Sequence, residues 1–539
     1  MTHYNLNRII IGVAAVYAVV ILAAVAFGPT AESDEPELSE YTPGYVDSQS
    51  GTPTPHTGVG GVSGDDVAIS GTILDESTDE PLAGVTVSAV DDHGEEVTTT
   101  TGADGRFQLP DVSDTTSVTF SLDGYESLEA ELGPDDEHII GLEAPRIEGR
   151  VINENGSPVR GATIAAGDVY TRSIENGIFR LEHVPDDADI VVKAAGFKSK
   201  VIEAGDYDGG FVLERESLQA VYAPASIVAD DDQFEEFLDM VEDSQVNAVV
   251  IDVKDALGRV HYESDVELAN EIGAVTGSMD LDHVLLDLAV RDIHAIARVS
   301  VFEDPMLAEA RPELGISDSF SDDLWRTWQG RAWANPYQEE VWDYNIALVQ
   351  ELAGYGFDEV QLTSVQFPDS GLVNRADFGQ ISTAGHRKAA IADFLDETYS
   401  AIATMPTRLA ADIFAMSVWD ESNNLTGQDL HTMVERVDYL HPRLFPSNFE
   451  AGSLGFDDPA AEPFAMVGRS IESGHEVLPR HLAIRLRPWL QAFSYGQAMP
   501  FDADDVREQI AAAERFDSTG WMLWNPDGEY DPEAFSEQD

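Results

Sequence analysis

The stretch GFDEVQLTSVQFPDSG, residues 356–371, contains a strand-like run that begins at Glu359. From residue 218 onward, runs of this kind alternate with helix-like stretches such as residues 231–244 and 504–516, an alternation typical of parallel β/α units. The runs begin at Ala220, Asn247, His294, Glu359, Arg408, Val437, His481 and Gly520. Eight such strands within residues 218–539 predict a (β/α)8 barrel.

Alternation along the strands predicts which side chains face the barrel interior. In VVIDVKD, residues 249–255, Ile251 and Val253 face the helices, so Asp252 and Lys254 are expected to face inward near the C-terminal mouth. The same rule turns further residues inward: Arg298, Ser300, Gln361, Thr363, Asp412, Arg485, Arg487 and Trp524. Active sites of such barrels lie at this mouth. Because unpaired buried charges are costly, the cluster indicates either a ligand pocket or an ion network that pairs Asp252 with Lys254 or Arg298.

Residues 356–371 resemble the segment GFDEIQFDYVRFP of a family of glycoside-hydrolase-like (β/α)8 barrels. The resemblance covers essentially the whole of residues 218–539 and rests on further segments: residues 247–262, 296–308, 333–361, 438–449, 487–496 and 520–526. It implies a barrel that acts on a polysaccharide or other glycan. It also shows departures from the family pattern. Thr363 and Gln366 stand where the family has Asp and Arg, and Phe445 and Asn448 stand where it has Tyr and His.

Glycoside hydrolysis needs two carboxyl groups on opposite sides of the scissile bond. The candidates are Asp252, Asp255, Asp304 and Asp412, and we expect Asp252 and Asp412 to be the catalytic pair. Thr363 cannot replace the family carboxylate, because a hydroxyl does not ionise usefully. The expected substrate-binding residues are Lys254, Asp255, Arg298, Asp304, Thr363, Asn448, Arg487 and Trp524. Two hypotheses therefore stand: a glycoside hydrolase, or a degenerate barrel that serves as a glycan-binding or envelope-structural module.

The composition is strongly acidic. Asp and Glu total 100 against 30 Lys and Arg, which gives a net charge of −70, yet 43% of the residues are hydrophobic. The acid therefore belongs to a folded surface, whose self-repulsion is screened at molar salt, and we expect a protein from a halophile. Such a surface excludes binding to phosphate backbones of nucleic acids. The chain has no cysteine and no zinc-ligand spacing, so we expect neither a metal nor a cofactor.

An apolar segment opens the chain. Residues 9–27 are uncharged, follow Arg8 and precede an acidic stretch, which predicts a transmembrane helix with the body of the protein outside the cell. A cleaved signal peptide is the alternative, and it would leave a secreted protein. Residues 28–66 are rich in Pro, Gly, Ser, Thr and acid, as in a flexible linker.

Two internal repeats follow, residues 67–145 and 146–215. ISGTILDESTDEPLAGVTV, from Ile69, matches IEGRVINENGSPVRGATI, from Ile147, and short alternating runs are separated by turn residues in both. This pattern predicts two β-sandwiches. Both repeats resemble the carboxypeptidase regulatory-like (transthyretin-like) domain. The matching positions are turn glycines and core aliphatics, so the resemblance implies a spacer or adhesive unit without peptidase activity.

Overall fold

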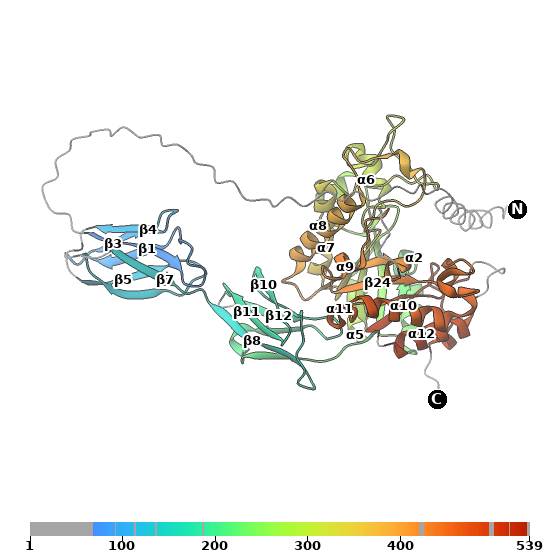
Figure 1. Cartoon of the computed structure of the whole chain (residues 1–539), viewed down its shortest axis with the longest axis horizontal. Coiled ribbons are helices and arrows are strands. Elements are labelled where there is room, and N and C mark those ends of the chain that lie inside the picture. The colour runs from blue at the N-terminus through green and yellow to red at the C-terminus, as the bar shows by residue number, and fades with distance from the viewer. Residues whose placement is uncertain are drawn as a thin grey trace, which may run out of the picture. The chain divides into compact units, whose positions relative to one another are not determined.

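The computed structural model describes residues 68–91, 93–110, 112, 115–134, 137–185, 188–419, 425–494, 501–516 and 518–535. The chain divides into two compact units, residues 1–143 and 144–539 (Figure 1). The expected transmembrane helix, residues 9–27, and the linker, residues 28–66, lie outside the described residues. Within the described ranges, no helix combines the length and apolar character needed to cross a membrane.

The first unit contains a β-sandwich whose sheets have the strand orders β4-β1-β7 and β3-β2-β5-β6. β1 pairs antiparallel with β4 and parallel with β7. Apolar side chains from both sheets, Ile73 and Phe120 among them, form its core. The strands are β1 (Ala68–Asp75), β2 (Thr86–Val90), β3 (Glu96–Thr100), β4 (Arg106–Pro110), β5 (Thr116–Ser121), β6 (Leu128–Leu132) and β7 (Glu137–Leu142).

The second unit begins with another sandwich of the same design. Its sheets have the orders β11-β8-β14 and β10-β9-β12-β13, which match the first sandwich strand for strand. β8 again pairs antiparallel with one neighbour and parallel with the last strand. The strands are β8 (Arg146–Asn153), β9 (Thr163–Ala166), β10 (Val169–Arg172), β11 (Ile178–Glu182), β12 (Asp189–Lys193), β13 (Lys200–Glu203) and β14 (Gly210–Leu213).

The rest of this unit is a closed barrel of eight parallel strands, which confirms the predicted barrel. The order is β15-β26-β25-β24-β23-β21-β19-β16, and β15 pairs with β16 to close the ring. Two short strands, β17 (Val260–Tyr262) and β18 (Val275–Met279), extend from β16. The barrel strands are β15 (Leu218–Ala223), β16 (Ala248–Lys254), β19 (His294–Ser300), β21 (Glu359–Thr363), β23 (Arg408–Phe414), β24 (Tyr439–Leu444), β25 (Trp489–Gln491) and β26 (Gly520–Trp524).

Helices cover the outside of the barrel. A large apolar cluster joins them to the outward faces of the strands, and a smaller cluster with Val250 and Ile296 fills the interior. Acidic caps begin several helices: Asp230, the N-cap residue of α3, accepts a hydrogen bond from the Gln233 N–H. The helices are α2 (Ala225–Val228), α3 (Asp231–Glu242), α4 (Glu267–Glu271), α5 (Leu281–Val290), α6 (Pro305–Ala310), α7 (Glu339–Tyr355), α8 (Ala384–Ile402), α9 (Leu430–Val434), α10 (Pro463–Val477), α11 (Arg480–Ala483) and α12 (Ala503–Arg515).

The stretch from Gly356 links a helix to a strand within a few residues. α7 ends at Tyr355, and Gly356 follows with a φ of 101°, a conformation that glycine adopts without steric cost. β21 begins at Glu359, and Ser364, directly after the strand, has a φ of 55°. This left-handed residue turns the chain sharply at the barrel mouth.

The seventh barrel strand differs from its prediction. The run from His481 was expected to form a strand, but Pro479 precedes a helical turn, α11, and β25 begins only at Trp489. Pro488 has no N–H to give to a ladder, so regular pairing starts after it. Arg485 therefore does not point into the barrel. Its Nη1 donates to the carbonyl oxygens of Val434 and Val437, which precede β24.

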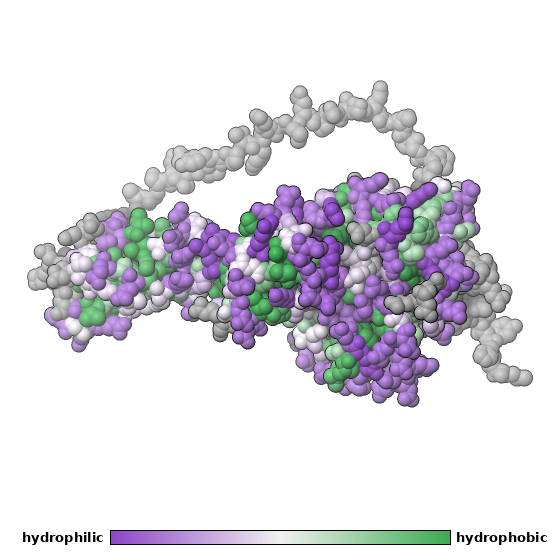
Figure 2. Space-filling model, turned by 90° about the horizontal axis from the view of Figure 1, so that it is seen from below, coloured by the Kyte–Doolittle hydropathy of each residue, from purple (hydrophilic) through white to green (hydrophobic). Residues whose placement is uncertain are grey.

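The second sandwich packs against the N-terminal end of the barrel. Lys193, at the end of β12, is buried, and its Nζ donates to the carbonyl oxygens of Ile402, Met405 and Thr407 at 3.0, 2.9 and 2.7 Å. The Gly196 N–H donates to the Tyr439 hydroxyl at 2.8 Å. These polar contacts cross from the sandwich to the barrel, and both parts belong to one compact unit. The face of the molecule shown in Figure 2 is mainly hydrophilic, as the composition requires.

Candidate functional site

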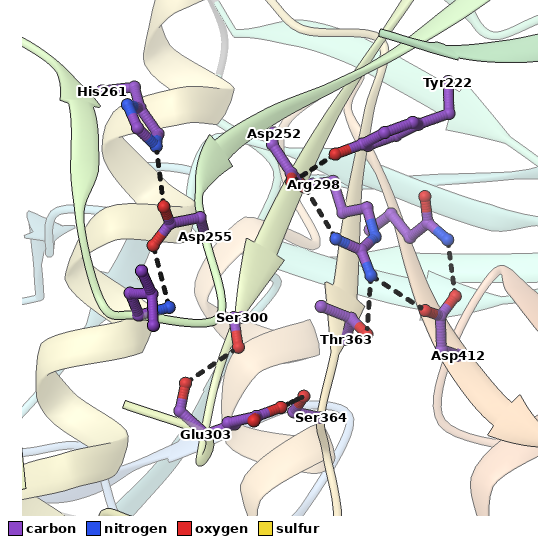
Figure 3. Close-up of polar contacts among 12 residues, drawn as sticks. Tyr222, Asp252, Asp255, His261, Arg298, Ser300, Glu303, Thr363, Ser364 and Asp412 are labelled. Carbon is purple, nitrogen blue, oxygen red and sulfur yellow. Dashed lines mark hydrogen bonds and ion pairs between the residues drawn. The ribbon is translucent and has the colours of Figure 1, made fainter. Parts of the chain in front are cut away.

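Two aspartates lie inside the barrel near the C-terminal ends of their strands. Asp252, on β16, accepts a hydrogen bond from Arg298 Nη1 at 2.7 Å on one oxygen and from the Tyr222 hydroxyl at 2.7 Å on the other (Figure 3). Asp412, on β23, accepts hydrogen bonds on Oδ1 from Gln361 at 2.6 Å and from the Trp489 indole at 2.9 Å. The structure thus brings together the two carboxylates expected to form the catalytic pair.

Arg298 lies between these carboxylates. Its Nη1 contacts Asp252, and its Nη2 lies 3.9 Å from Asp412 Oδ2 and donates to Thr363 Oγ1 at 3.2 Å. Burial alone would lower the pKa of Arg298, but the charges of Asp252 and Asp412 outweigh burial and raise it. The guanidinium is therefore a permanent cation held at the centre of the site.

Aromatic rings form one wall of the site. The rings of Tyr222 and Trp524 lie 4.0 Å apart, and the Arg298 guanidinium lies 4.8 Å from the Trp524 ring centroid. Trp489 meets Trp524 edge-on at 5.4 Å. Burial raises the pKa of Tyr222, and the charge of Asp252 adds to this effect, so its hydroxyl stays protonated and donates. Trp524 retains partial exposure and is thus the ring of this wall that solvent reaches.

The site contains polar atoms that no described residue satisfies. Asp412 Oδ2, Gln361 Oε1, His441 Nδ1 and Arg298 Nε are buried and have no hydrogen-bond partner within the described part of the chain. Burial lowers the pKa of His441 well below its ordinary value, and Arg487 lowers it further, so the imidazole is neutral. Because buried polar groups in native proteins are nearly always paired, these atoms mark a place where water or a ligand completes the hydrogen bonding.

A buried ion pair lies inside the barrel, nearer its N-terminal end than Asp252 and Asp412. Glu359, the first residue of β21, accepts hydrogen bonds from Arg487 Nη2 on both carboxylate oxygens, and both side chains are fully buried. Burial raises the pKa of Glu359, whereas Arg487 opposes that rise. Arg487 does face the interior, but it lies at the N-terminal end of the barrel. Its inward orientation is as predicted, and Glu359 holds its guanidinium.

Lys254 also departs from its prediction. The register shifts between Asp252 and Lys254, so that Lys254 pairs with Val299 instead of continuing the alternation. This β-bulge turns Lys254 toward the helices, where its Nζ contacts Asn345 on α7 at 3.0 Å and Asp304 at 2.7 Å. Asp304 caps α6 and is completely buried. Both residues are thus internal structural partners and are not part of the mouth.

Two further predicted binding residues lie apart from the pair. Asp255 accepts a hydrogen bond from His261 (Figure 3) and another from Arg259, both in the β16–β17 hairpin. Burial would raise the pKa of Asp255, but these hydrogen bonds outweigh burial and hold it well below its usual range. Asn448 is exposed in a short turn, Pro446–Asn448, that follows β24.

Sequence reasoning missed several residues at the site. Tyr222 and His441 come from β15 and β24, and each faces inward at the level of the pair. Glu303 and Asp369 follow the ends of β19 and β21. Burial raises the pKa of Asp369, and the charge of Glu303 adds to that rise, although Arg443 opposes it. Glu303 and Asp369 follow barrel strands, where the active-site residues of such barrels lie. This position in the sequence could have identified them.

The chain is similar to two protein families and to several solved structures. The model of a family described as "Carboxypeptidase regulatory-like domain" matches residues 68–138. The PgaB (BpsB) glycoside hydrolase domain from Bordetella bronchiseptica is 14% identical, with 58% of this chain and 95% of that chain covered and a TM-score of 0.45. A hypothetical protein from Ruminiclostridium thermocellum is 28% identical, with 35% and 96% covered and a TM-score of 0.32.

A class V chitinase from Pseudomonas fluorescens is 13% identical, with 59% of this chain and 97% of that chain covered and a TM-score of 0.38. A comparison with curated proteins found no match. The model of a family described as "Putative glycosyl hydrolase domain" matches residues 220–530, which is more than half of the chain. The chain therefore belongs to this glycosyl hydrolase domain family.

Proposed function

We propose that the barrel is a glycoside hydrolase whose carboxyl pair is Asp252 and Asp412. The observation that carries the proposal is the position of Arg298, which contacts Asp252 at 2.7 Å and lies 3.9 Å from Asp412. One guanidinium thus contacts both carboxyl groups, and glycosidases place their two carboxyl groups on either side of the scissile bond, roughly 5–9.5 Å apart. The unpartnered oxygen of Asp412 supports a ligand at this place.

The surroundings of the two carboxyl groups suit different roles. Both oxygens of Asp252 accept hydrogen bonds, from Arg298 and Tyr222, which hold this carboxyl group in one orientation for the role of base or nucleophile. In Asp412, Oδ2 has no hydrogen-bond partner among the described residues, so this oxygen is the one that can face the glycosidic oxygen of a substrate as the acid. In this assignment Trp524 stacks on a sugar face.

We further propose that the substrate is an extracellular or cell-envelope polysaccharide. The apolar segment at residues 9–27 and the linker that follows support an exported, membrane-anchored protein. The net charge of −70 supports a host that lives at high salt. In this view the two sandwiches are spacers between the membrane and the barrel.

A second candidate function rests on Thr363. Its hydroxyl accepts a hydrogen bond from Arg298 at the position where the family motif has Asp. Loss of that carboxylate favours a barrel that binds glycans without cleaving them. The aromatic wall and the unpartnered polar atoms would serve binding equally well.

The test is a screen of polysaccharides for release of reducing ends in molar KCl. The wild-type protein is compared with Asp412→Asn and Asp252→Asn, and binding of each substrate is measured by calorimetry. We expect both variants to lose about 10²–10⁴-fold in turnover while they still bind. Asp255→Asn is the matched control, because this nearby carboxylate lies outside the pair. Binding without turnover in every protein, the wild type included, would establish the second function in place of the first.

A further inference from the structure

A large cleft lies where the second sandwich meets the N-terminal end of the barrel, at the end opposite the carboxyl pair. Two adjoining cavities of about 1060 Å³ and about 1150 Å³ share Arg160, Gly161, His481 and Arg485 in their lining. The sandwich supplies Arg160 and Gly161, and the segment around α11 supplies the other two. The cleft is therefore built from both parts of the second unit.

Basic residues outnumber acidic residues in the lining of this cleft, which is the opposite of the whole chain. Acidic residues outnumber Lys and Arg by 100 to 30 in the whole sequence. In the cleft, six arginines face four acidic residues. The arginines are Arg160, Arg172, Arg215, Arg436, Arg480 and Arg485. Three of the four acids are already paired: Glu216 with Arg408 at 3.0 Å, Asp396 with Arg436 at 2.8 Å and Glu175 with Arg160 at 3.7 Å.

Arg485 is the most telling of these arginines. It is 7% exposed, and no carboxylate of the described residues lies within ion-pair distance of it. Its Nη1 donates to two backbone carbonyl oxygens, which carry no net charge. A buried guanidinium without a carboxylate partner is costly, and an anion in the cleft would relieve that cost.

The pKa values of Arg485 and His481 are both lowered, in part by neighbouring arginines. Burial lowers the pKa of Arg485, and although the charge of Asp438 opposes this fall, the charge of Arg172 adds to it. The pKa of His481 is lowered by burial and then by Arg160 and Arg485. Arg160 has only a long contact with Glu175, 3.7 Å, and is 44% exposed, so it is available to a ligand.

We propose that this cleft binds an acidic oligosaccharide through its carboxylate or sulfate groups, with Arg160, Arg480 and Arg485 as the contacting residues. Arginine matches the geometry of these oxyanions and binds them with two parallel hydrogen bonds. The volume of the cleft exceeds what one inorganic anion fills and suits a ligand of several sugar units. The net charge of −70 repels a long polyanion such as a nucleic acid, which favours a short ligand.

The saccharide part of this inference rests on the proposed function of the barrel, whereas the anion site does not. The cleft would hold an acidic chain segment away from the carboxyl pair. It would thus act as a second binding site on the same polymer and raise the effective concentration of substrate at the mouth.

The experiment is calorimetry with the whole protein in molar KCl. The probes are trigalacturonic acid, neutral cellotriose, inorganic sulfate and a short oligothymidylate. We expect trigalacturonic acid to bind and the Arg160→Gln/Arg480→Gln variant to bind it about tenfold more weakly or worse, as expected from the loss of charge-assisted hydrogen bonds. Arg326→Gln is the matched control, because Arg326 is also 44% exposed and also pairs with a glutamate. Asp412→Asn should bind trigalacturonic acid normally even if the barrel proves to have no hydrolase activity.

Three results would overturn the proposal. One is equal binding of trigalacturonic acid by the double variant and the wild type. Another is equal affinity for cellotriose, which would remove the role of the anion. The third is tighter binding of sulfate or oligothymidylate than of trigalacturonic acid, which would make the site one for phosphate-like anions or nucleic acid.

Discussion

Arg487 and Glu359 form an ion pair inside the barrel, and neither side chain reaches solvent. The same guanidinium lies 3.1 Å from the His441 ring nitrogen and 4.1 Å from the centroid of the Tyr439 ring. It therefore connects β21 with β24 and with the segment that leads into β25. Burial holds the pKa of His441 well below its ordinary value, and the Arg487 charge lowers it further.

Breaking this pair should strongly destabilise the barrel. Glu359→Gln leaves the Arg487 charge buried without a counter-charge, and we expect a loss of about 3–5 kcal/mol in the free energy of unfolding. Chemical denaturation in molar KCl measures it. Glu359→Leu combined with Arg487→Met should recover much of the loss, because it removes both charges. Arg311→Gln, at an exposed ion pair, should change little. Equal stability of Glu359→Gln and wild type would contradict this account.

Tyr222→Phe should impair catalysis more than binding. It removes one of the two donors that hold Asp252 and leaves the ring in place against Trp524. A hydrogen bond to a charged group corresponds to roughly 10–100-fold in rate, so we expect kcat to fall by about that factor while KM changes little. Tyr355→Phe, which alters an exposed hydroxyl far from the pair, is the control. A change confined to KM would assign Tyr222 to substrate binding instead.

Stability should rise with pH through the titration of Lys193. Burial lowers the pKa of this ammonium group in the folded protein to about 8, against an ordinary value of 10.5. Between these pH values the unfolded chain holds more protons than the folded one, so the free energy of unfolding increases with pH, by roughly 1–3 kcal/mol. Below pH 8 both states are protonated and the slope vanishes.

The measurement is urea denaturation of wild type and Lys193→Met from pH 7 to 10.5. Because Lys193→Met also removes hydrogen bonds to three carbonyl oxygens, the pH slopes are compared instead of the absolute stabilities. The wild-type slope should exceed that of the variant. Parallel slopes would show that Lys193 does not titrate in this window.

Salt should stabilise the fold over a wide range. With a net charge of −70, self-repulsion acts over about 30 Å at 0.01 M salt but over only about 3 Å at 1 M. We expect the unfolding temperature to rise continuously from low salt to molar KCl. Thermal scans at matched osmolality with sucrose separate screening from general exclusion effects. A flat or falling profile would argue against adaptation to high salt.

Much of the barrel could be predicted, because parallel strands leave a local pattern of apolar runs. The run from Glu359 forms a strand as expected, and Asp252, Arg298 and Asp412 face inward because alternation holds along their strands. The fold family could also be recognised from local motifs. These features depend on residues that are close together in the sequence.

The errors arise where a local pattern does not determine the geometry. Alternation continues through Arg485 and Arg487, but the prolines around them prevent a regular strand. Tyr222 and His441 were missed because their partners come from other strands, far away in the sequence. Only the closed barrel brings them beside Asp252 and Asp412.

The bulge in β16 lets one short strand serve two purposes. Before the extra residue, the strand presents Asp252 to the interior, and after it Lys254 anchors the strand to α7 and to Asp304. Without the bulge, regular alternation through Val253 would turn Lys254 inward and carry its ammonium group into the barrel interior beside Arg298. The barrel interior would then hold two cations, Arg298 and Lys254, for the carboxylates of Asp252 and Asp412. Asp304 would be left buried without its counter-ion. The one extra residue in β16 thus keeps a second positive charge out of the barrel interior.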